Sequence, residues 1–364
     1  MKILENALYQ LDIAQVSDMN LPWEKLNNKS ILITGATGMI ASVIIDILMR
    51  QNREQNRNIQ IYAISRKEQR ARERFEVYWN EPMFIWCSHD INNPLPELGN
   101  MDYILHTASN THPRAYSSDP IGTITANVQG TYQLLDYAAR HNCERFLFFS
   151  SVEIYGENRN DVDKFDEQYM GYIDCNTTRA GYPESKRLGE TLCNAFAAQR
   201  GQDFVIGRFS RVYGPTMSME DSKAVAQFIK KAAAGEDILL KSEGNQLYSY
   251  TYVVDAASAA LYLLLKGENQ SAVNVVDRAS DIRLGNLASL LAEEAGTKVV
   301  FELPDAIERA GYSTATKALL DGIKLERLGW KAYTPIRQGL SKTVQILRQT
   351  GRVQDEHSVD TCSR

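Results

Sequence analysis

A short apolar run at 31–34 leads directly into the segment Gly35-Ala-Thr-Gly38-Met-Ile-Ala41, and a helical pattern follows. This passage from strand through glycine turn to helix limits the possible folds more than any other feature of the chain. Gly35 permits the tight turn, Gly38 lets the backbone approach a pyrophosphate, and Ala41 allows close helix–strand packing. Free N–H groups at the start of the helix favour an anion. The segment predicts a dinucleotide site, although an ordinary strand–helix turn has the same outline.

Apolar strands and helical segments alternate along most of the chain after residue 30. Strands are expected at residues 31–34, 59–64, 84–87, 103–106, 146–150, 204–207 and 273–276. Helices are expected at residues 40–50, 121–141, 182–198, 223–234, 256–266 and 284–295. Unbroken apolar runs are typical of parallel strands buried on both faces, and the alternation favours a doubly wound sheet. We predict an α/β fold of the Rossmann type, preceded by a partly helical segment at 1–28 and followed by a disordered tail at 349–364.

Length and charge restrict the class of protein. A chain of 364 residues indicates about two domains or lobes. Forty Lys and Arg residues against 45 Asp and Glu residues give a net charge of −5, which argues against a nucleic-acid partner. No apolar run approaches the ~18 residues that a membrane span needs, and the N-terminus lacks the apolar core of a secretion signal. We expect a cytoplasmic protein without a membrane partner.

Cysteine and histidine spacing indicates neither a disulfide framework nor a metal site. The five cysteines are Cys87, Cys143, Cys175, Cys193 and Cys362, an odd number without a CxxC pair. The five histidines show neither HxxxH nor HExxH spacing. Free thiols in a reducing compartment are the simplest interpretation, and we assign no metal.

The residues after the second expected strand bear on the choice of dinucleotide. An acidic residue at this point usually binds the ribose 2′-hydroxyl of NAD. This chain has Ser65, Arg66 and Lys67 there instead. Because a guanidinium suits a 2′-phosphate, the sequence favours NADP and leaves NAD possible, with a solvated basic loop as the alternative. After the third strand, Asp90 is placed to bind the adenine amino group or to cap a turn.

A tyrosine, a lysine and a serine form the candidate catalytic group. Tyr182 and Lys186 are four residues apart and share one face of an expected helix. A nearby ammonium stabilises a phenolate and lowers the pKa of the tyrosine, which makes Tyr182 a usable base near neutral pH. Ser151 ends the fifth strand, at the carboxyl edge where such sheets bind ligands. Alone, the Tyr–Lys pair is equally consistent with a helix surface, but with Ser151 and the glycine turn it predicts an enzyme site.

Several motifs in fixed order make the sequence similar to a known family. They are TGATGMIA at 34–41, DPIGTITANVQGT at 119–131, SSVEIYG at 150–156, Tyr182 with Lys186, RFSRVYGP at 208–215, YVVD at 252–255 and LGW at 328–330. From about residue 30 to 347 the chain resembles an extended short-chain dehydrogenase/reductase of the nucleotide-sugar epimerase/dehydratase group. The resemblance implies a Rossmann domain at 29–213, to which a strand near 272–276 returns, and a smaller nucleotide-sugar-binding lobe at 214–348.

The resemblance also implies a reaction. Tyr182 takes a proton from a sugar hydroxyl, usually at C4, while the nicotinamide takes the hydride and a 4-keto sugar results. Because a keto group acidifies neighbouring C–H bonds, epimerisation, 4,6-dehydration or decarboxylation can follow. The residues expected to contact the cofactor are Gly35, Thr37, Gly38, Met39, Ile40, Ser65, Arg66, Asp90, Ile91, Thr107, Ala108, Ser109 and Asn127.

Glu153 bears on the second step of that reaction. Dehydratases and UDP-glucuronate decarboxylases both carry a Glu at this place, which gives Glu153 a catalytic role as acid or base at C5 or near a carboxylate. A purely structural carboxylate is the alternative. The segment 108–116 resembles the decarboxylase substrate loop, and we assign its His112 to substrate binding.

Three positions depart from the family pattern. Val152 stands where dehydratases have Asp and decarboxylases have Ser, Tyr248 replaces the usual Arg of the lobe, and Arg211 replaces the usual Asn of RxxNxYGP. Burying a diphosphate without a cation is costly. We predict that Arg211 reaches the diphosphate or an acidic group of the sugar, and that Tyr248 packs on the base or sugar. The alternative is an ion pair between Arg211 and a carboxylate such as Asp255.

We therefore expect an NAD(P)-dependent nucleotide-sugar enzyme that is dehydratase- or decarboxylase-like because of Glu153. An epimerase or an NADPH-dependent keto-sugar reductase is the alternative that Arg66 and the altered lobe favour. A non-catalytic NADP sensor of the same fold is a third possibility. Such a sensor need not keep Ser151, Tyr182 and Lys186 together, whereas this chain has all three. The family pairs two helices per subunit in a dimer interface, so a homodimer through 121–141 and 182–198 is expected.

Overall fold

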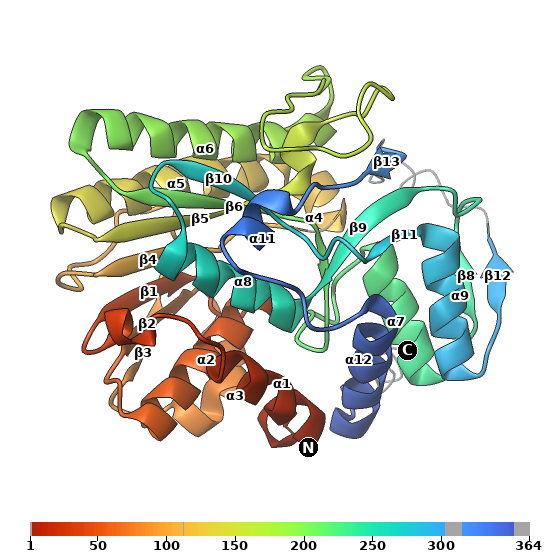
Figure 1. The fold of residues 1–364 in the computed structure, drawn as a ribbon, viewed down its shortest axis with the longest axis horizontal. Coiled ribbons are helices and arrows are strands. Elements are labelled where there is room, and N and C mark those ends of the chain that lie inside the picture. Colours follow the sequence, from red (N-terminus) through yellow and green to blue (C-terminus); the bar gives the residue numbers. More distant parts are fainter. Residues whose placement is uncertain (1, 112, 303–314, 353–364) are drawn as a thin grey trace, which may run out of the picture.

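The computed structural model describes residues 2–111, 113–302 and 315–352, and its centre is a seven-stranded parallel sheet (Figure 1). The strand order is β10-β6-β5-β4-β1-β2-β3. The strands are β1 (Ser30–Thr34), β2 (Gln60–Ser65), β3 (Phe84–Ser88), β4 (Tyr103–His106), β5 (Arg145–Ser151), β6 (Phe204–Phe209) and β10 (Ser271–Val275). The doubly wound sheet predicted from the sequence is confirmed, and so is the return of the strand near 272–276, since β10 pairs in parallel with β6.

Helices cover both faces of this sheet (Figure 1). One face carries α5 (Pro120–Arg140) and α6 (Gly181–Arg200), which pack against each other; the other carries α2 (Met39–Gln55) and α8 (Val253–Lys266). All five residues of β1 are buried, as expected for a strand between two helical layers. The strand order reverses between β1 and β4: from β1 the next strands are added toward one edge of the sheet, and from β4 they are added toward the other edge. Sheets of this type bind ligands at that reversal, beyond the carboxyl ends of the strands.

The N-terminal segment is part of the core. Its helix α1 (Ala7–Ser17) packs on α2, which confirms the helical start predicted for residues 1–28. Asp12 on this helix accepts a hydrogen bond from Tyr252 Oη at 2.7 Å and pairs with Lys342 Nζ at 2.5 Å. These contacts tie the start of the chain to segments more than 200 residues further on.

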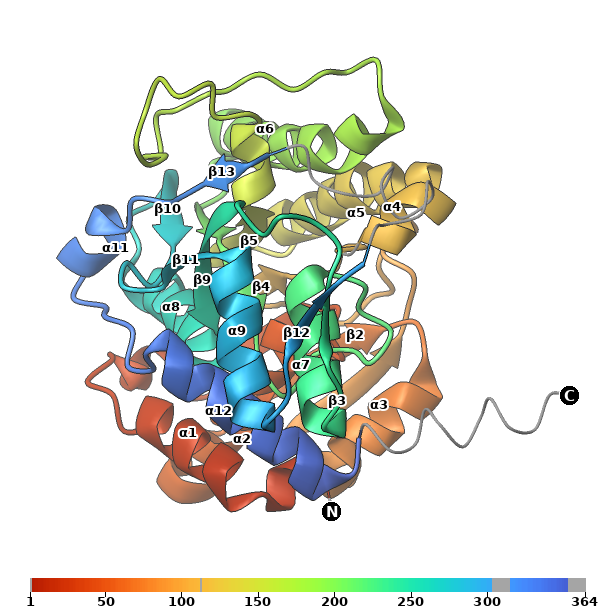
Figure 2. The same ribbon diagram turned by 90° about the vertical axis from the view of Figure 1, so that its right-hand side faces the viewer.

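A smaller lobe follows β6. Its sheet contains β7 (Arg211–Tyr213), β9 (Leu247–Tyr252), β11 (Asp281–Arg283) and β13 (Lys317–Ala318), and a second sheet pairs β8 (Ile238–Leu240) with β12 (Val299–Phe301). The helices α7 (Ala224–Ala234), α9 (Leu284–Ala295) and α12 (Ile336–Thr350) pack together beside these strands (Figure 2). The remaining short helices are α3 (Glu68–Phe75), α4 (Pro113–Ser118) and α11 (Ile323–Arg327). The sequence predicted α7 and α9 but neither the short strands of this lobe nor α12.

The ordered chain extends beyond the boundary predicted for the tail at 349. Helix α12 continues to Thr350 because Leu340 and Val344 are buried at helical spacing. Arg352 then donates a hydrogen bond to the carbonyl of Pro215 at 2.5 Å. The prediction was therefore wrong for residues 349–352, and the rest of the predicted tail lies outside the described residues.

Two further sequence predictions concern the cysteines and membrane-spanning segments. Cys87, Cys143, Cys175 and Cys193 are free thiols, while Cys362 lies outside the described residues. Within the described ranges, every helix is too short or too polar to cross a membrane.

Candidate active site

The glycine turn between β1 and α2 forms a backbone cradle. Gly35 has a φ of +63°, and a Cβ atom there would lie 2.8 Å from the Cα of Ala108. Gly38 is the N-cap of α2 and has no side chain to satisfy the first N–H groups of the helix. The turn therefore needs glycine at position 35, and the start of α2 offers backbone donors of the kind that bind a pyrophosphate. The turn and the start of α2 also contain the other predicted loop residues, Thr37, Met39 and Ile40.

The segment after β4 closes over this cradle. Thr107 Oγ1 donates to the carbonyl of Thr34 at 2.5 Å, and the N–H of Ala108 donates to Thr34 Oγ1 at 3.2 Å. Thr34 is the last residue of β1, so these two bonds hold the segment against the glycine turn. Thr107 and Ala108 thus lie at the reversal of the strand order, beside the glycine turn, and their contact with the cofactor stays a prediction.

Asn127 holds the segment after β4 against α6. Its Oδ1 accepts from Ser109 Oγ at 2.7 Å, and its Nδ2 donates to Ser185 Oγ at 2.9 Å. Asn127 is completely buried, and both ends of its amide have partners. The structure places it beneath the predicted cofactor site, where it supports Ser109; direct contact with the cofactor stays a prediction.

The carboxyl ends of β2 and β3 carry the remaining predicted cofactor residues. Ser65 Oγ is buried and has no hydrogen-bond partner among the described residues, and Arg66 after it is exposed. Asp90 Oδ1 accepts from the N–H of Asn92 at 3.0 Å, so this carboxylate does cap a turn. Ile91 is buried against α5. These residues lie at the sheet edge where the adenosine half of a dinucleotide binds.

Tyr182 lies in the first turn of α6, and Ser151 ends β5. Burial raises the pKa of the Tyr182 hydroxyl to about 12, while a hydrogen bond with Ser151 acts in the opposite direction. Tyr182 is only 6% exposed, which explains the size of the effect. The structure thus brings together the tyrosine and the serine that the sequence placed in one site.

Lys186 lies one helical turn after Tyr182 and is almost completely buried. Its Nζ donates to the carbonyl of Phe149 at 2.8 Å and lies 5.0 Å from the ring centroid of Phe148. Burial lowers the pKa of this ammonium to about 7. A cation one helical turn from Tyr182 can stabilise a phenolate, provided that it keeps its proton.

Glu153 lies two residues after Ser151, and its carboxylate is paired with a cation that the sequence analysis missed. Arg179 Nη2 donates to Glu153 Oε2 at 2.6 Å. The Arg179 guanidinium also lies 4.9 Å from the ring centroid of Tyr116. Tyr116 in turn stacks on Tyr182, with centroids 4.8 Å apart. These contacts connect Glu153 to the predicted base through a continuous group of side chains.

Arg211 and Tyr248 lie together at the edge of the lobe. The guanidinium carbon of Arg211 is 3.5 Å from the ring centroid of Tyr248. Burial raises the pKa of the Tyr248 hydroxyl, Arg211 opposes this rise, and the Glu153 carboxylate adds to it. The Glu153 carboxylate thus influences the Tyr248 hydroxyl through its charge.

Asp255 does not pair with Arg211 in the structure. Its two oxygens accept the backbone N–H groups of Tyr333 at 3.0 Å and Thr334 at 3.1 Å. The alternative ion pair considered from the sequence was therefore wrong. His112, the third predicted substrate residue, lies outside the described residues.

Comparison with known proteins identifies the family. The NAD dependent epimerase/dehydratase family matches residues 31–276. The chain belongs to this family. UDP-glucuronic acid decarboxylase 1 of Xenopus tropicalis is 30% identical over 327 residues, which cover 89% of this chain and 73% of that protein. UDP-glucuronic acid decarboxylase 6 of Arabidopsis thaliana is 30% identical over 318 residues, covering 86% and 87%.

Solved structures of the epimerase/dehydratase family share the fold. A UDP-glucose 4-epimerase from Thermotoga maritima superposes with a TM-score of 0.75 at 22% identity, over 88% of this chain and 99% of that one. A dTDP-glucose 4,6-dehydratase from Streptomyces venezuelae also gives a TM-score of 0.75 at 22% identity, over 88% and 97%. The family resemblance predicted from the motifs is confirmed.

The sequence analysis missed the role of Arg179, because its contact with Glu153 forms only when the chain packs into this fold. Arg179 precedes Tyr182 by three residues, but it meets Glu153 across 26 positions of sequence. Arg179 lies in the short helical turn Thr178–Ala180 directly before α6, and its position in the sequence gives no sign of its distant partner.

Proposed function

We propose that this member of the epimerase/dehydratase family converts a nucleotide sugar through a 4-keto intermediate, with a second step of the dehydratase or decarboxylase kind. The observation that carries the proposal is the position of Glu153. This carboxylate, paired with Arg179, belongs to the same group of side chains as Tyr182 and Ser151. Two curated relatives at 30% identity are UDP-glucuronic acid decarboxylases, which supports a UDP-uronic acid as the first substrate to test.

Tyr182 is the base of the first step. Its phenolate takes the proton of the sugar hydroxyl, and the Ser151 hydroxyl donates a hydrogen bond to the same oxygen. Lys186 stabilises the phenolate as long as it carries its charge. When bound, the nicotinamide cofactor supplies the hydride acceptor for this oxidation.

Glu153 acts in the second step. Once the sugar is a ketone, the neighbouring C–H bonds are acidic, and a carboxylate next to them can accept or return a proton. Arg179 fixes the direction in which the carboxylate points, because a guanidinium binds a carboxylate with defined geometry. Removing the negative charge of Glu153 should therefore affect the second step more than the first.

The residues around the glycine turn fit a nicotinamide dinucleotide, and we infer that NADP is preferred. The cradle at Gly35 would be filled by any Cβ atom, and the N-terminus of α2 offers free donors for the pyrophosphate. Arg66 is exposed directly after β2, and no ion-pair partner is found for it among the described residues. A guanidinium at that place is suited to a 2′-phosphate.

The Arg211–Tyr248 pair is the proposed substrate-binding pair. Arg211 Nη1 is buried and has no hydrogen-bond partner among the described residues. A guanidinium stacked on a ring keeps donors in its plane for an anion, so Arg211 can bind the diphosphate or an acidic sugar group. Tyr248 then offers its buried ring to the base or the sugar.

We also infer a homodimer through α5 and α6. Both helices carry exposed apolar side chains, with Ile121 at 75%, Tyr132 at 47% and Leu188 at 44% exposure. Apolar groups exposed together on two packed helices favour association with a second copy. The molar mass in solution, with and without a charge introduced at Ile121, tests this inference.

An epimerase or NADPH-dependent keto-sugar reductase is the second candidate. Val152 is buried and offers no proton donor next to Ser151, whereas an acidic side chain there would assist elimination. Arg66, as the proposed 2′-phosphate contact, also favours the reductase. An epimerase uses the same first step through Tyr182. A reductase uses the reverse of that step, in which the Tyr182 hydroxyl gives its proton to the ketone oxygen and NADPH would supply the hydride.

Product mass distinguishes these reactions. The protein is incubated with UDP-, dTDP-, GDP- and CDP-sugars, including UDP-glucuronic acid, with NAD or NADP. Loss of water indicates dehydration and loss of carbon dioxide indicates decarboxylation. A new chromatographic peak of unchanged mass indicates epimerisation, and a gain of two hydrogens by an added 4-keto nucleotide sugar with NADPH indicates reduction. No conversion of any nucleotide sugar, by a protein that binds the cofactor, would overturn the proposed function in favour of a sensor.

A further inference from the structure

Glu190 is a buried carboxylate without a role in the proposed reaction. It lies on α6 one helical turn after Lys186, so the two side chains share a face of the helix. Glu190 is 8% exposed, and a carboxylate that is buried to this extent needs partners. The side chains that bind the Glu190 carboxylate indicate its role.

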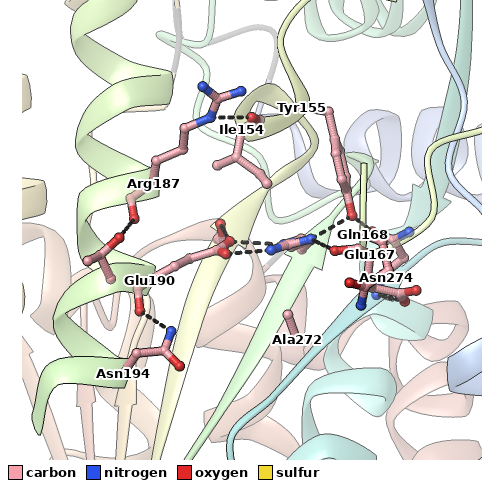
Figure 3. A network of polar contacts seen from close by, with 12 residues as sticks. Ile154, Tyr155, Glu167, Gln168, Arg187, Glu190, Asn194, Ala272 and Asn274 are labelled. Carbon is pink, nitrogen blue, oxygen red and sulfur yellow. Dashed lines mark hydrogen bonds and ion pairs between the residues drawn. The ribbon is translucent and has the colours of Figure 1, made fainter. Parts of the chain in front are cut away.

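Two side chains hold the Glu190 carboxylate in place (Figure 3). Oε1 accepts from Ser150 Oγ at 2.5 Å and from Arg208 Nε at 3.1 Å, while Oε2 accepts from Arg208 Nη2 at 2.7 Å. The bidentate contact fixes both oxygens. Ser150 directly precedes Ser151, so the carboxylate is also tied to the strand end that carries the catalytic serine.

Arg208 has further partners beyond this ion pair. Its Nη1 donates to Tyr155 Oη at 3.1 Å and to the carbonyl of Glu167 at 2.8 Å. The pair also borders a cavity of about 530 Å³ beside β6 and β10. The cavity is lined mainly by polar side chains, among them Glu167, Asn194, Gln270 and Lys324. A polar cavity of this size can hold water beside the buried pair.

The fixed carboxylate of Glu190 stabilises the charged form of Lys186. Burial lowers the pKa of Lys186 to about 7, and Glu190 is the main influence in the opposite direction. Cys193 on α6 acts weakly in the same sense, and His106 at the end of β4 also faces the ammonium. Burial keeps His106 neutral, with a pKa well below its usual value, so it offers Lys186 no negative charge.

We propose that Glu190 is a positioning residue: held by Ser150 and Arg208, its carboxylate is the counter-ion that keeps Lys186 charged beside the Tyr182 base. The proposal rests on the proposed function, because it concerns the base of that reaction. Without the carboxylate, Lys186 releases its proton at lower pH. A neutral Lys186 no longer stabilises the phenolate, and the reaction loses the alkaline part of its pH range.

Replacement of Glu190 by Gln tests this directly. The protonation of Lys186 is followed by NMR of the full chain labelled with ¹³Cε-lysine and saturated with NAD, and the Lys186 signal is the one that Lys186→Arg removes. In Glu190→Gln the midpoint should fall by about one pH unit, as expected for loss of a nearby opposite charge. The alkaline limb of kcat, measured with the nucleotide sugar that turns over, should move by the same amount.

Three variants serve as controls. Glu190→Asp keeps the charge and should restore most of the wild-type midpoint. Glu184→Gln makes the same change on the same helix, but Glu184 is partly exposed and pairs with Arg187, so the midpoint should stay unchanged. If Glu190→Gln fails to fold, the double variant Glu190→Gln/Arg208→Gln removes the carboxylate without leaving the guanidinium unpaired. Because this double variant also removes the positive charge of Arg208, its midpoint is compared with that of Arg208→Gln, and a downward shift is expected between these two variants.

The two measurements separate the two proposals. A folded Glu190→Gln whose Lys186 midpoint equals that of the wild type, or a double variant whose midpoint equals that of Arg208→Gln, would overturn the role of Glu190. Absence of turnover with every nucleotide sugar would overturn the proposed function, while the NMR titration still decides whether Glu190 keeps Lys186 charged. A shift in the NMR midpoint with an unchanged alkaline limb would show that Lys186 does not control the rate, which also contradicts the proposal.

Discussion

The guanidinium of Arg211 lies on the ring of Tyr248, with 3.5 Å between the guanidinium carbon and the ring centroid. The contact arises because β7 and β9 run side by side in parallel, with Arg211 opposite Tyr250. Tyr248 is fixed at its other end, where its hydroxyl donates to the carbonyl of Ala315 at 2.6 Å. The buried Nη1 of Arg211 has no hydrogen-bond partner among the described residues, so this donor remains available for an anion.

Replacing Arg211 by Asn, the usual residue of the motif, should raise KM for the nucleotide sugar tenfold or more and leave kcat almost unchanged. A group that binds ground state and transition state alike acts on KM alone. Steady-state kinetics measures this, with UDP binding by calorimetry as a second readout. Arg283→Asn, an exposed arginine of the same lobe, is the control. An unstable Arg211→Asn protein whose folded fraction binds substrate normally would contradict the binding role.

Tyr182→Phe should leave folding and cofactor binding intact while lowering turnover by ~10²–10⁴-fold, the range expected for loss of a general base. The phenyl ring still stacks on Tyr116, so the packing of the site is retained. Cofactor titration and turnover of the same preparation measure both quantities. Tyr172→Phe, on an exposed tyrosine of the loop before α6, is the matched control. Turnover of Tyr182→Phe within a factor of two of the wild type would exclude Tyr182 as the base.

The large sheet and the catalytic group could be predicted because both depend on local sequence. A strand buried on both faces needs an unbroken apolar run, and β5 has one that ends at Ser151. Tyr182 and Lys186 share a helix face whatever the rest of the chain does, since four residues make about one turn. The glycine turn is likewise a local feature, because the positive φ at Gly35 favours glycine at that position.

The other contacts of the site and the short strands of the smaller lobe depend on packing between segments that are distant in the sequence. The ion pair of Arg179 with Glu153 and the stacking of Arg211 on Tyr248 arise only when separate elements pack together. Short strands such as β7 have three residues, too few to show an alternating pattern. Both ends of the Asn127 amide bind side chains of other segments, Ser109 and Ser185, and the motif alone does not show these contacts.

Arg66→Ala should weaken NADP binding by roughly ten- to a hundredfold and leave NAD binding unchanged, because a charge-assisted contact contributes ~1.5–3 kcal/mol. Calorimetric titration of both cofactors measures this. Arg72→Ala is the control, since Arg72 is exposed on the neighbouring helix α3 and pairs with Glu68. If wild-type protein binds NAD as tightly as NADP, Arg66 points into solvent and the preference was wrongly inferred.

Asp12→Asn should lower the free energy of unfolding by ~1–3 kcal/mol, the cost of breaking a buried charge-assisted contact. Asp12 is buried and accepts from Tyr252 and Lys342, so it joins α1 to the lobe. Denaturant titration measures the loss. Asp18→Asn at the exposed end of the same helix should have no comparable effect. Equal stability of the two variants would show that the N-terminal helix contributes little to holding the lobe.

Glu153→Gln separates the two steps of the proposed reaction. The amide keeps the size of the side chain and can still accept a hydrogen bond from Arg179, but it cannot take a proton. If the second step is dehydration or decarboxylation, the variant should still oxidise the sugar and then stall. Reduced cofactor, followed by its absorbance in single-turnover experiments, should accumulate to a level that the wild type never reaches.

Arg179→Lys extends this experiment to the partner of Glu153. A lysine keeps the charge but loses the planar fork, so Glu153 should be held less accurately and the second step should slow without stopping. Glu157→Gln, on a carboxylate four residues further along, should behave as the wild type in the same experiment. If Glu153→Gln turns over normally and accumulates no reduced cofactor, the carboxylate is structural. The epimerase or reductase interpretation would then be the better one, because neither needs an acid or base at that position.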